Sequence, residues 1–308
     1  MASDPVQAPG PATPAGPQTR PLRPRELQDA LNFHLYHPLS WQLARRLAKS
    51  PLTPNMVSVI GGLCVVAAAF AYAQQAWPIS AALGLLLHMT WHVVDGADGD
   101  LARLTGRSSP IGEMVDGLCD YLSHMVLYLA LGWMLSRSLG AAGWWWMLAA
   151  GISHAVQSNH VEVQRRSYQW WVLGTPWLRN THAADGSATA SSGFGKLVSA
   201  YLGVASGMTP HALKIDAATA AAQGNPAQLS QIASAVRAEA PPLLLLCKWL
   251  GPNPRAIVLG AAMLAAGHSG QGPLWYFAYQ AVALNLLLVV SVIAHNRAAR
   301  RIADQIGA

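Results

Sequence analysis

Charged residues are scarce in this chain of 308 residues, and their scarcity limits the classes of protein to which it can belong. Asp, Glu, Lys and Arg together make up 11% of the sequence, whereas soluble domains usually carry about a quarter of such residues. Hydrophobic residues make up 52%. The composition therefore excludes an ordinary soluble domain and indicates a protein that lies in a lipid bilayer.

Cysteine is also rare, and its positions exclude two further classes. The three cysteines, Cys64, Cys119 and Cys247, lie far apart in the sequence. Their spacing does not match a zinc site, and no pairing suggests a disulfide-stabilised scaffold. We interpret them as small apolar side chains within or beside the hydrophobic segments.

Residues 1–25 contain little aliphatic bulk and much Pro, Ala and Gly. Such a segment cannot bury enough apolar surface to offset the entropy lost on ordering, so we expect a disordered tail. We do not expect a secretory signal peptide, because no apolar core follows a basic start.

Residues 26–50 carry a leucine at every fourth position and end in a basic cluster, which predicts an amphipathic helix. Such a helix suits the plane of an anionic membrane surface. An ordinary amphipathic helix packed on the rest of the protein is an equal alternative. The residues of the pattern are Leu27, Leu31, Leu35, Leu39, Leu43 and Leu47, followed by Arg45, Arg46 and Lys49 at the end.

Six apolar stretches predict an all-α, polytopic membrane protein with six transmembrane helices in one domain at residues 51–301, before a short tail at 302–308. Between the fourth and fifth stretches lies a long polar connection at about 165–240, a length typical of a functional or partly disordered segment. Within it, 195–202 and 229–238 could form short surface helices. The apolar stretches cover residues 56–73, 78–94, 111–135, 143–163, 254–267 and 273–295.

The basic residues predict how the chain is oriented in the membrane. Nearly all of them fall in the N-terminal segment, the loop around Arg103 and Arg107, the long connection and the C-terminus, whereas the opposite loops add little beyond Arg137. The positive-inside rule then places both termini and the acidic residues 95–120 at the cytoplasmic face. This distribution also explains the net charge of +6 without a nucleic-acid partner.

Between the second and third apolar stretches lies the acidic segment DGADGDLARLTGRSSPIGEMVDGLCD, residues 95–120. On a helix, Asp95 and Asp98 share a face, and Asp116 and Asp120 share a face of the helix that follows the break at 108–110. Four carboxylates that converge at a membrane edge repel one another strongly unless divalent cations bind between them. Hard cations take oxygen ligands from Asp, so the segment predicts a metal-dependent catalytic site.

The same segment fits the pattern D-x2-D-G-x2-A-R-x8-G-x3-D-x3-D without a gap. In this pattern and its six-span setting the chain resembles the CDP-alcohol phosphotransferase (CDP-alcohol phosphatidyltransferase) family of integral membrane enzymes. Eight fixed positions at fixed spacing make a specific signal. They are Asp95, Asp98, Gly99, Ala102, Arg103, Gly112, Asp116 and Asp120.

The resemblance implies a transferase of phospholipid biosynthesis that breaks a CDP-linked phosphoanhydride, passes a phosphorus-containing group to an alcohol and releases CMP. It implies two divalent cations, Mg²⁺ or Mn²⁺, and makes Asp120 the base that takes the proton of the acceptor hydroxyl. The implied metal ligands are Asp95, Asp98, Asp116 and Asp120. The implied nucleotide and phosphate contacts are Asp95, Asp98, Gly99, Ala102, Arg103 and Gly112.

Within that set, the small Gly99 and Ala102 would let a nucleotide approach the helix, and Arg103 offers a planar fork for a phosphate. Gly112 would let the two motif helices approach each other. Asp100 falls on a different face of the first motif helix, so we expect it to be a solvated residue at the helix end.

Further candidate residues lie outside the motif. The end of the fourth apolar stretch should come near the site, where its polar residues either hold substrate phosphate or anchor a helix end at the headgroups. Asn55 either faces the nucleotide or caps the first transmembrane helix. The candidates in the fourth stretch are Asn159, Glu162, Arg165, Arg166 and Tyr168.

The resemblance leaves the reaction branch open. Residues 109–113, Ser-Pro-Ile-Gly-Glu, are similar to the branch that transfers a phosphoalcohol from CDP-choline, CDP-ethanolamine or a related donor to a lipid hydroxyl. Gly117, Leu118 and Cys119 depart from that branch. The alternative is phosphatidyl transfer from CDP-diacylglycerol to a polar alcohol.

Two readings from other classes also compete. Acidic residues within a membrane can mark the path of a divalent-cation transporter, but here they cluster at one face and Arg103 would repel cations. The other is a non-catalytic scaffold at the lipid surface. We expect a CDP-linked donor, an alcohol or lipid acceptor and membrane lipid as partners, a homodimer by resemblance, and location in a bacterial inner membrane.

Overall fold

The computed structural model describes residues 23–74, 76–177, 203–204 and 207–307 of the chain. Over these residues the fold is helical and contains no strand, which confirms the predicted all-α class for the part described. Residues 1–22 of the predicted tail and the predicted helix at 195–202 lie outside the described residues.

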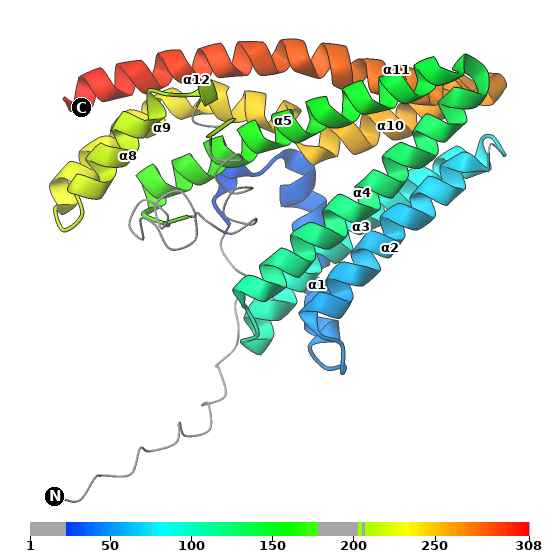
Figure 1. Ribbon diagram of the computed structural model, residues 1–308. Helices are drawn as coiled ribbons and strands as arrows, with labels where there is room; N and C mark the ends of the chain where they lie inside the picture. The colour runs from blue at the N-terminus through cyan, green and yellow to red at the C-terminus, as the bar shows by residue number, and fades with distance from the viewer. Residues whose placement is uncertain (1–22, 75, 178–202, 205–206, 308) are drawn as a thin grey trace, which may run out of the picture.

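Three long helices form the first group, with a shorter one packed on it. Figure 1 shows α2, Pro54–Ala73, α3, Ile79–Thr105, and α4, Pro110–Leu139, running side by side. Local signals in the sequence set their ends. The Thr53 side chain caps α2 by accepting from the Met56 N–H, and the Ser109 side chain caps α4 in the same way through Gly112. The residue that ends α3 is Gly106, whose φ of 65° suits glycine.

The N-terminal segment is less regular than the predicted single helix. A 3₁₀ turn, Arg25–Leu27, precedes a π-helical turn, Asn32–Tyr36, and then α1, His37–Leu47. α1 packs on α3, where Ser40 donates to the Val93 carbonyl at 2.8 Å. Phe33, Leu35 and Leu39 of this segment are 36–43% exposed. The N-terminal segment therefore packs on the protein, and it also has exposed apolar side chains.

The second group contains the described helices that follow α4. Its helices run roughly along one another and meet the first group where α4 leads into α5 (Figure 1). α9 is unbroken and is longer than the short surface helix predicted at 229–238. The helices are α5, Ala141–Leu173, α8, Ala212–Ala221, α9, Pro226–Trp249, α10, Pro252–Ala266, α11, Gly272–Ala278, a π-helical turn, Tyr279–Ala283, and α12, Leu284–Ile306.

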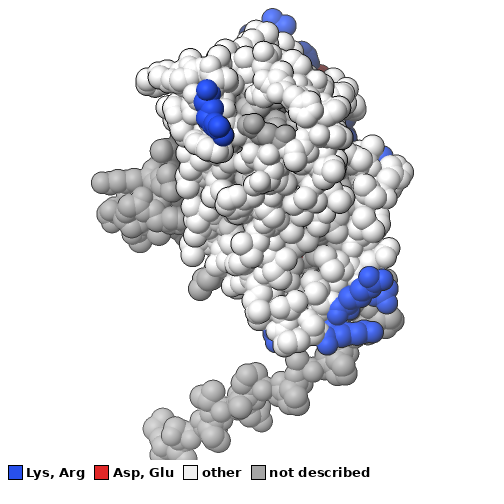
Figure 2. Space-filling model, turned by 90° about the vertical axis from the view of Figure 1, so that its right-hand side faces the viewer, with Lys and Arg blue, Asp and Glu red and all other residues white. Residues whose placement is uncertain are grey.

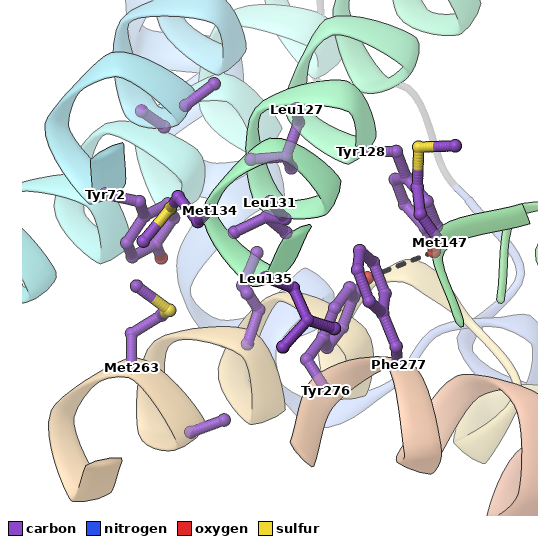
Figure 3. Close-up of a cluster of buried hydrophobic side chains, with 14 of the residues drawn as sticks. Tyr72, Leu127, Tyr128, Leu131, Met134, Leu135, Met147, Met263, Tyr276 and Phe277 are labelled. Carbon is purple, nitrogen blue, oxygen red and sulfur yellow. Dashed lines mark hydrogen bonds between the residues drawn. The ribbon is translucent and has the colours of Figure 1, made fainter. Parts of the chain in front are cut away.

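A buried core joins the two groups at the end away from the acidic segment. Figure 3 shows side chains of α4, among them Leu131, against Tyr276 and Phe277 of α11. The hydroxyls of Tyr128 and Tyr276 lie 3.4 Å apart, and the Gln280 amide donates to both, at 2.8 and 3.0 Å. This contact anchors α4, the helix on which Asp116 and Asp120 lie.

Within the part of the chain that the structure describes, three helical stretches are long and apolar enough to cross a membrane by length and composition: Pro54–Ala73, Met114–Leu139 and Gly272–Ile306. Figure 2 shows a face on which Lys and Arg lie toward the ends and the middle is uncharged. These features support an integral membrane protein. The remaining predicted crossings correspond to α3, α5 and α10, and none of these is among the three stretches.

Candidate metal centre

Three carboxylates of the acidic segment meet at one place. Asp95 and Asp98 come from α3 and Asp116 comes from α4, and one oxygen of each lies within 4.8 Å of the other two. The grouping follows from the helical spacing, because residues three apart on α3 face the same neighbouring helix. Asp98 is buried, whereas Asp95 and Asp116 are half-buried.

The group suits a hard divalent cation. Mg²⁺ and Ca²⁺ bind carboxylate oxygens at about 2.0–2.6 Å, so oxygens on opposite sides of one ion lie about 4–5 Å apart. The spread of the oxygens of Asp95, Asp98 and Asp116 falls within that range. The donor set contains oxygen alone, without sulfur or imidazole, which favours Mg²⁺ or Mn²⁺ over zinc or copper.

Asp98 is held in place from two sides. The Ser58 hydroxyl of α2 donates to Asp98 Oδ2 at 2.5 Å, and the Gly99 N–H donates to Asp98 Oδ1. Ser58 is buried, so its hydroxyl has few other partners available. The third helix of the first group thus fixes the orientation of a carboxylate that α3 supplies.

Asp120 lies beside the group without belonging to it. Its carboxylate is close enough to that of Asp95 for the two to interact electrostatically, but the set of three carboxylates does not include it. The Trp91 indole N–H donates to Asp120 Oδ1 at 2.8 Å, and His124 Nδ1 lies 2.8 Å from the Asp120 carbonyl oxygen. Trp91 therefore fixes the orientation of the Asp120 carboxylate through Oδ1. The other oxygen, Oδ2, can bind different partners.

The prediction for Asp100 was wrong. This residue is 2% exposed, and its Oδ1 accepts from Arg23 at 2.8 Å and from Arg103 at 2.6 Å. Two guanidinium groups surround this carboxylate in place of the water that we expected. Their charges offset the free-energy cost of removing the carboxylate from water. Arg103 itself is paired in this way, while its side chain remains 48% exposed.

The other motif positions lie along the same helices. Ala102 is half-buried on α3. At Gly112 the nearest neighbours are the Ser109 hydroxyl and the side-chain oxygen of Asn55, at 3.2 and 3.5 Å from an added Cβ. Gly112 therefore faces the start of α2 instead of the other motif helix, and it brings Asn55 to the edge of the site. The capping role considered for Asn55 belongs to Thr53.

The residues predicted from α5 form their own set of contacts. Glu162 accepts from both Arg165 and Arg166 at 2.7–2.9 Å. Tyr168 donates to Glu26 of the N-terminal segment at 3.2 Å. Asn159 is buried on α5. None of these residues contributes to the group of three carboxylates.

Ser58, Trp91 and Arg23 are the contacts that the sequence interpretation missed. Trp91 precedes Asp95 by four residues, and this spacing on one helix face could have pointed to the site. An indole N–H within an apolar helix also needs an acceptor. No local signal pairs Arg23 with Asp100, because 77 residues separate them.

The fold and the carboxylate group together define a helical membrane protein with a candidate centre for a hard divalent cation. The sequence model of CDP-alcohol phosphatidyltransferase matches residues 51–209, which include the whole acidic segment. The chain belongs to this family, as the motif predicted.

One curated relative is choline/ethanolaminephosphotransferase 1 of Arabidopsis thaliana. It is 31% identical to this chain over 112 residues, which are 32% of this chain and 27% of the relative. The chain thus spans about a quarter of the length of that relative.

Proposed function

We propose that the protein transfers a phosphorus-containing group from a CDP-linked donor to an alcohol acceptor and releases CMP, as part of phospholipid synthesis. The grouping of Asp95, Asp98 and Asp116 within 4.8 Å carries this proposal, because a diphosphate needs cations beside it to be attacked. Membership of the family supports the reaction class.

Two divalent cations, Mg²⁺ or Mn²⁺, would be held by Asp95, Asp98, Asp116 and Asp120. When bound, they would neutralise the diphosphate of the donor and the charge that develops on the leaving phosphate. Around them, Ser58 keeps the Asp98 carboxylate oriented. The nucleotide would lie along Gly99, Ala102 and Gly112, which have a small side chain or none.

Asp120 serves as the general base. The acceptor hydroxyl loses its proton to the Asp120 carboxylate, and its oxygen forms a bond to the phosphorus that carries the alcohol. The bond from that phosphorus to the bridging oxygen breaks, and CMP leaves with that oxygen and its electron pair. The Trp91 N–H holds one oxygen of Asp120, so that the other stays available for the proton.

Phosphoalcohol transfer to a lipid hydroxyl is the branch we favour. The similarity of residues 109–113 to that branch and the name of the Arabidopsis relative support it. Phosphatidyl transfer from CDP-diacylglycerol to a polar alcohol is the second candidate, and the family description itself favours it. Residues 117–119 differ from the sequence usual in the first branch, which supports the second candidate.

The test is a donor panel. Purified protein is incubated with Mg²⁺ or Mn²⁺ and CDP-choline, CDP-ethanolamine or CDP-diacylglycerol, with diacylglycerol or a polar alcohol as acceptor, and released CMP is measured. We expect metal-dependent CMP release with a CDP-alcohol and diacylglycerol. Release with CDP-diacylglycerol alone would move the protein to the second branch. Flux of metal into proteoliposomes without CMP release would instead indicate a transporter.

We further propose that six crossings place the site at the cytoplasmic edge of the membrane, with the N-terminal segment on the headgroups. The exposed Leu35 and Leu39 support contact of that segment with lipid. Residues 51–301 would then form one catalytic domain. A homodimer in a bacterial inner membrane remains our expectation from the resemblance.

A further inference from the structure

A single buried carboxylate oxygen holds two guanidinium groups beside the candidate metal centre. Asp100 Oδ1 accepts from Arg23 Nη2 at 2.8 Å and from Arg103 Nη2 at 2.6 Å. The Asp100 side chain is 3% exposed, whereas those of Arg23 and Arg103 are 29% and 48% exposed. The three side chains together carry a net charge of +1, and the positive groups are the ones that reach the surface.

The guanidinium of Arg103 lies over the motif glycine. An added Cβ at Gly99 would be 3.4 Å from Arg103 Nη2 and 3.6 Å from Nη1. The N–H of the same glycine donates to Asp98 of the metal centre. Arg103 thus stands next to the place where the diphosphate of a donor would lie. Arginine has five N–H donors, so the bond to Asp100 leaves others for a phosphate.

Arg23 reaches Asp100 from a segment that is itself tied down. The Gln28 amide donates to the Arg23 carbonyl at 2.8 Å, and Gln28 Oε1 lies 2.7 Å from His37 Nδ1. Farther along the segment, Asn253 of α10 donates to Asp29 at 2.7 Å. These bonds hold Arg23 in place and connect it to the second group of helices. Arg23 lies outside the residues that the family model matches.

We propose that Arg23 is a positioning residue that keeps Arg103 available to the donor diphosphate. Without Arg23, the buried Asp100 would have Arg103 as its only guanidinium partner among the contacts above, and the resulting pair would be neutral. With Arg23 in place, the negative charge of Asp100 is already balanced by the Arg23 guanidinium. The positive charge of Arg103 is then not neutralised by Asp100 and can attract an anionic ligand. This inference rests on the proposed function, because the ligand is the diphosphate of a CDP-linked donor.

The test is binding of CDP to the purified full-length protein with Mn²⁺, measured by isothermal titration calorimetry. We expect Arg23→Gln to weaken CDP binding about tenfold, the range of one lost charge-assisted contact. The KM for the donor should rise in parallel, with little change in kcat or in the KM for the acceptor. Arg23→Lys should restore most of the affinity because it keeps the charge.

The matched control is Arg301→Gln, which breaks another arginine–carboxylate pair. Arg301 donates to Glu239 of α9 through Nε at 3.0 Å, and neither residue belongs to the candidate site. This variant should bind CDP as the wild type does. Equal weakening in Arg301→Gln and Arg23→Gln would overturn the proposal, because it would indicate a general loss of positive charge or of packing.

A double-mutant comparison shows whether Arg23 acts through Asp100. In an Asp100→Asn background, the additional change Arg23→Gln should alter CDP affinity by less than about twofold. The neutral asparagine side chain needs no guanidinium, so this pair also guards against a fold defect in Arg23→Gln alone. A tenfold loss in both backgrounds would contradict the proposal. If the wild type neither binds CDP nor releases CMP, the proposed function fails; CDP binding that Arg23→Gln leaves unchanged overturns this inference alone.

Discussion

At the scale of single residues, uncharged donors orient the carboxylates of the candidate site. Ser58 and Trp91 donate to Asp98 and Asp120, respectively. Each bond fixes one oxygen of a carboxylate that would otherwise rotate about its terminal torsion. The motif therefore describes the charges of the site, whereas the surrounding helices determine where those charges point.

The contact of Trp91 with Asp120 leads to the first prediction. Trp91→Phe keeps an aromatic ring but removes the N–H that orients the proposed base, so kcat should fall about tenfold. The KM for the donor should change little. Trp145→Phe is the control, because Trp145 is 70% exposed on α5. A kcat for Trp91→Phe equal to that of Trp145→Phe would show that the bond does not serve the reaction.

The helical spacing of the motif was enough to predict that Asp95, Asp98 and Asp116 approach one another. The same spacing could not predict the burial of Asp100, because it showed only that this residue lies on a different face of the helix from Asp95 and Asp98. Its burial depends on Arg23, which arrives from a segment far along the chain. Contacts of this kind depend on tertiary packing that no local pattern encodes.

At the scale of elements, the helix ends around the site were readable from the sequence, and the interruptions elsewhere were not. Ser109 caps α4 next to the predicted break. We expected a short surface helix at 229–238, but α9 continues past it through Pro241 and Pro242, with Leu244 and Cys247 buried beyond them. Each proline removes one N–H from the ladder, and its ring crowds the carbonyl of the residue four positions earlier. The burial of Leu244 and Cys247 offsets part of that cost.

The packing of α1 on α3 leads to a second prediction. A Cβ at Gly96 would lie 2.6 Å from the Ser40 hydroxyl, so Gly96→Ala should push the two helices apart and lower stability by about 1–3 kcal/mol. At Gly117 of α4 nothing lies within 4 Å of an added Cβ. Gly117→Ala should therefore be neutral, or stabilising by up to about 1 kcal/mol.

The two glycine variants are compared by their thermal unfolding midpoints in the same detergent. A midpoint for Gly96→Ala at or above that of Gly117→Ala would contradict the packing of α1 described here. In that case the N-terminal segment would be held by the membrane surface more than by α3.

At the scale of the whole molecule, the sequence predicted a helix at every one of the six apolar stretches, and the structure has one at each. Only three stretches are long and apolar enough to cross a membrane by themselves among the described residues. α3 carries Asp95, Asp98 and Asp100, and α10 has 15 residues, about 22 Å, against a hydrocarbon thickness of about 30 Å. The crossings assigned to α3, α5 and α10 therefore stay a prediction.

The third prediction concerns topology. Single cysteines at three exposed positions, Ser50→Cys, Ser138→Cys and Gln305→Cys, are labelled with a membrane-impermeant maleimide in sealed vesicles of known orientation. We expect the cysteines at positions 50 and 305 to react from the cytoplasmic side and the cysteine at position 138 from the other side. The wild type gives the background of the native cysteines. Labelling of positions 50 and 305 from opposite sides would exclude six crossings.

The most direct measurement of the central claim is Mn²⁺ binding, followed by electron paramagnetic resonance as the loss of the free-ion signal on addition of protein. We predict that the wild type binds Mn²⁺ and that Asp98→Asn and Asp116→Asn each weaken binding by at least about tenfold. Asp304→Asn, which changes an exposed carboxylate of α12, should bind as the wild type does. Absence of Mn²⁺ binding in the wild type, or equal binding by all these variants, would contradict a metal centre at Asp95, Asp98 and Asp116.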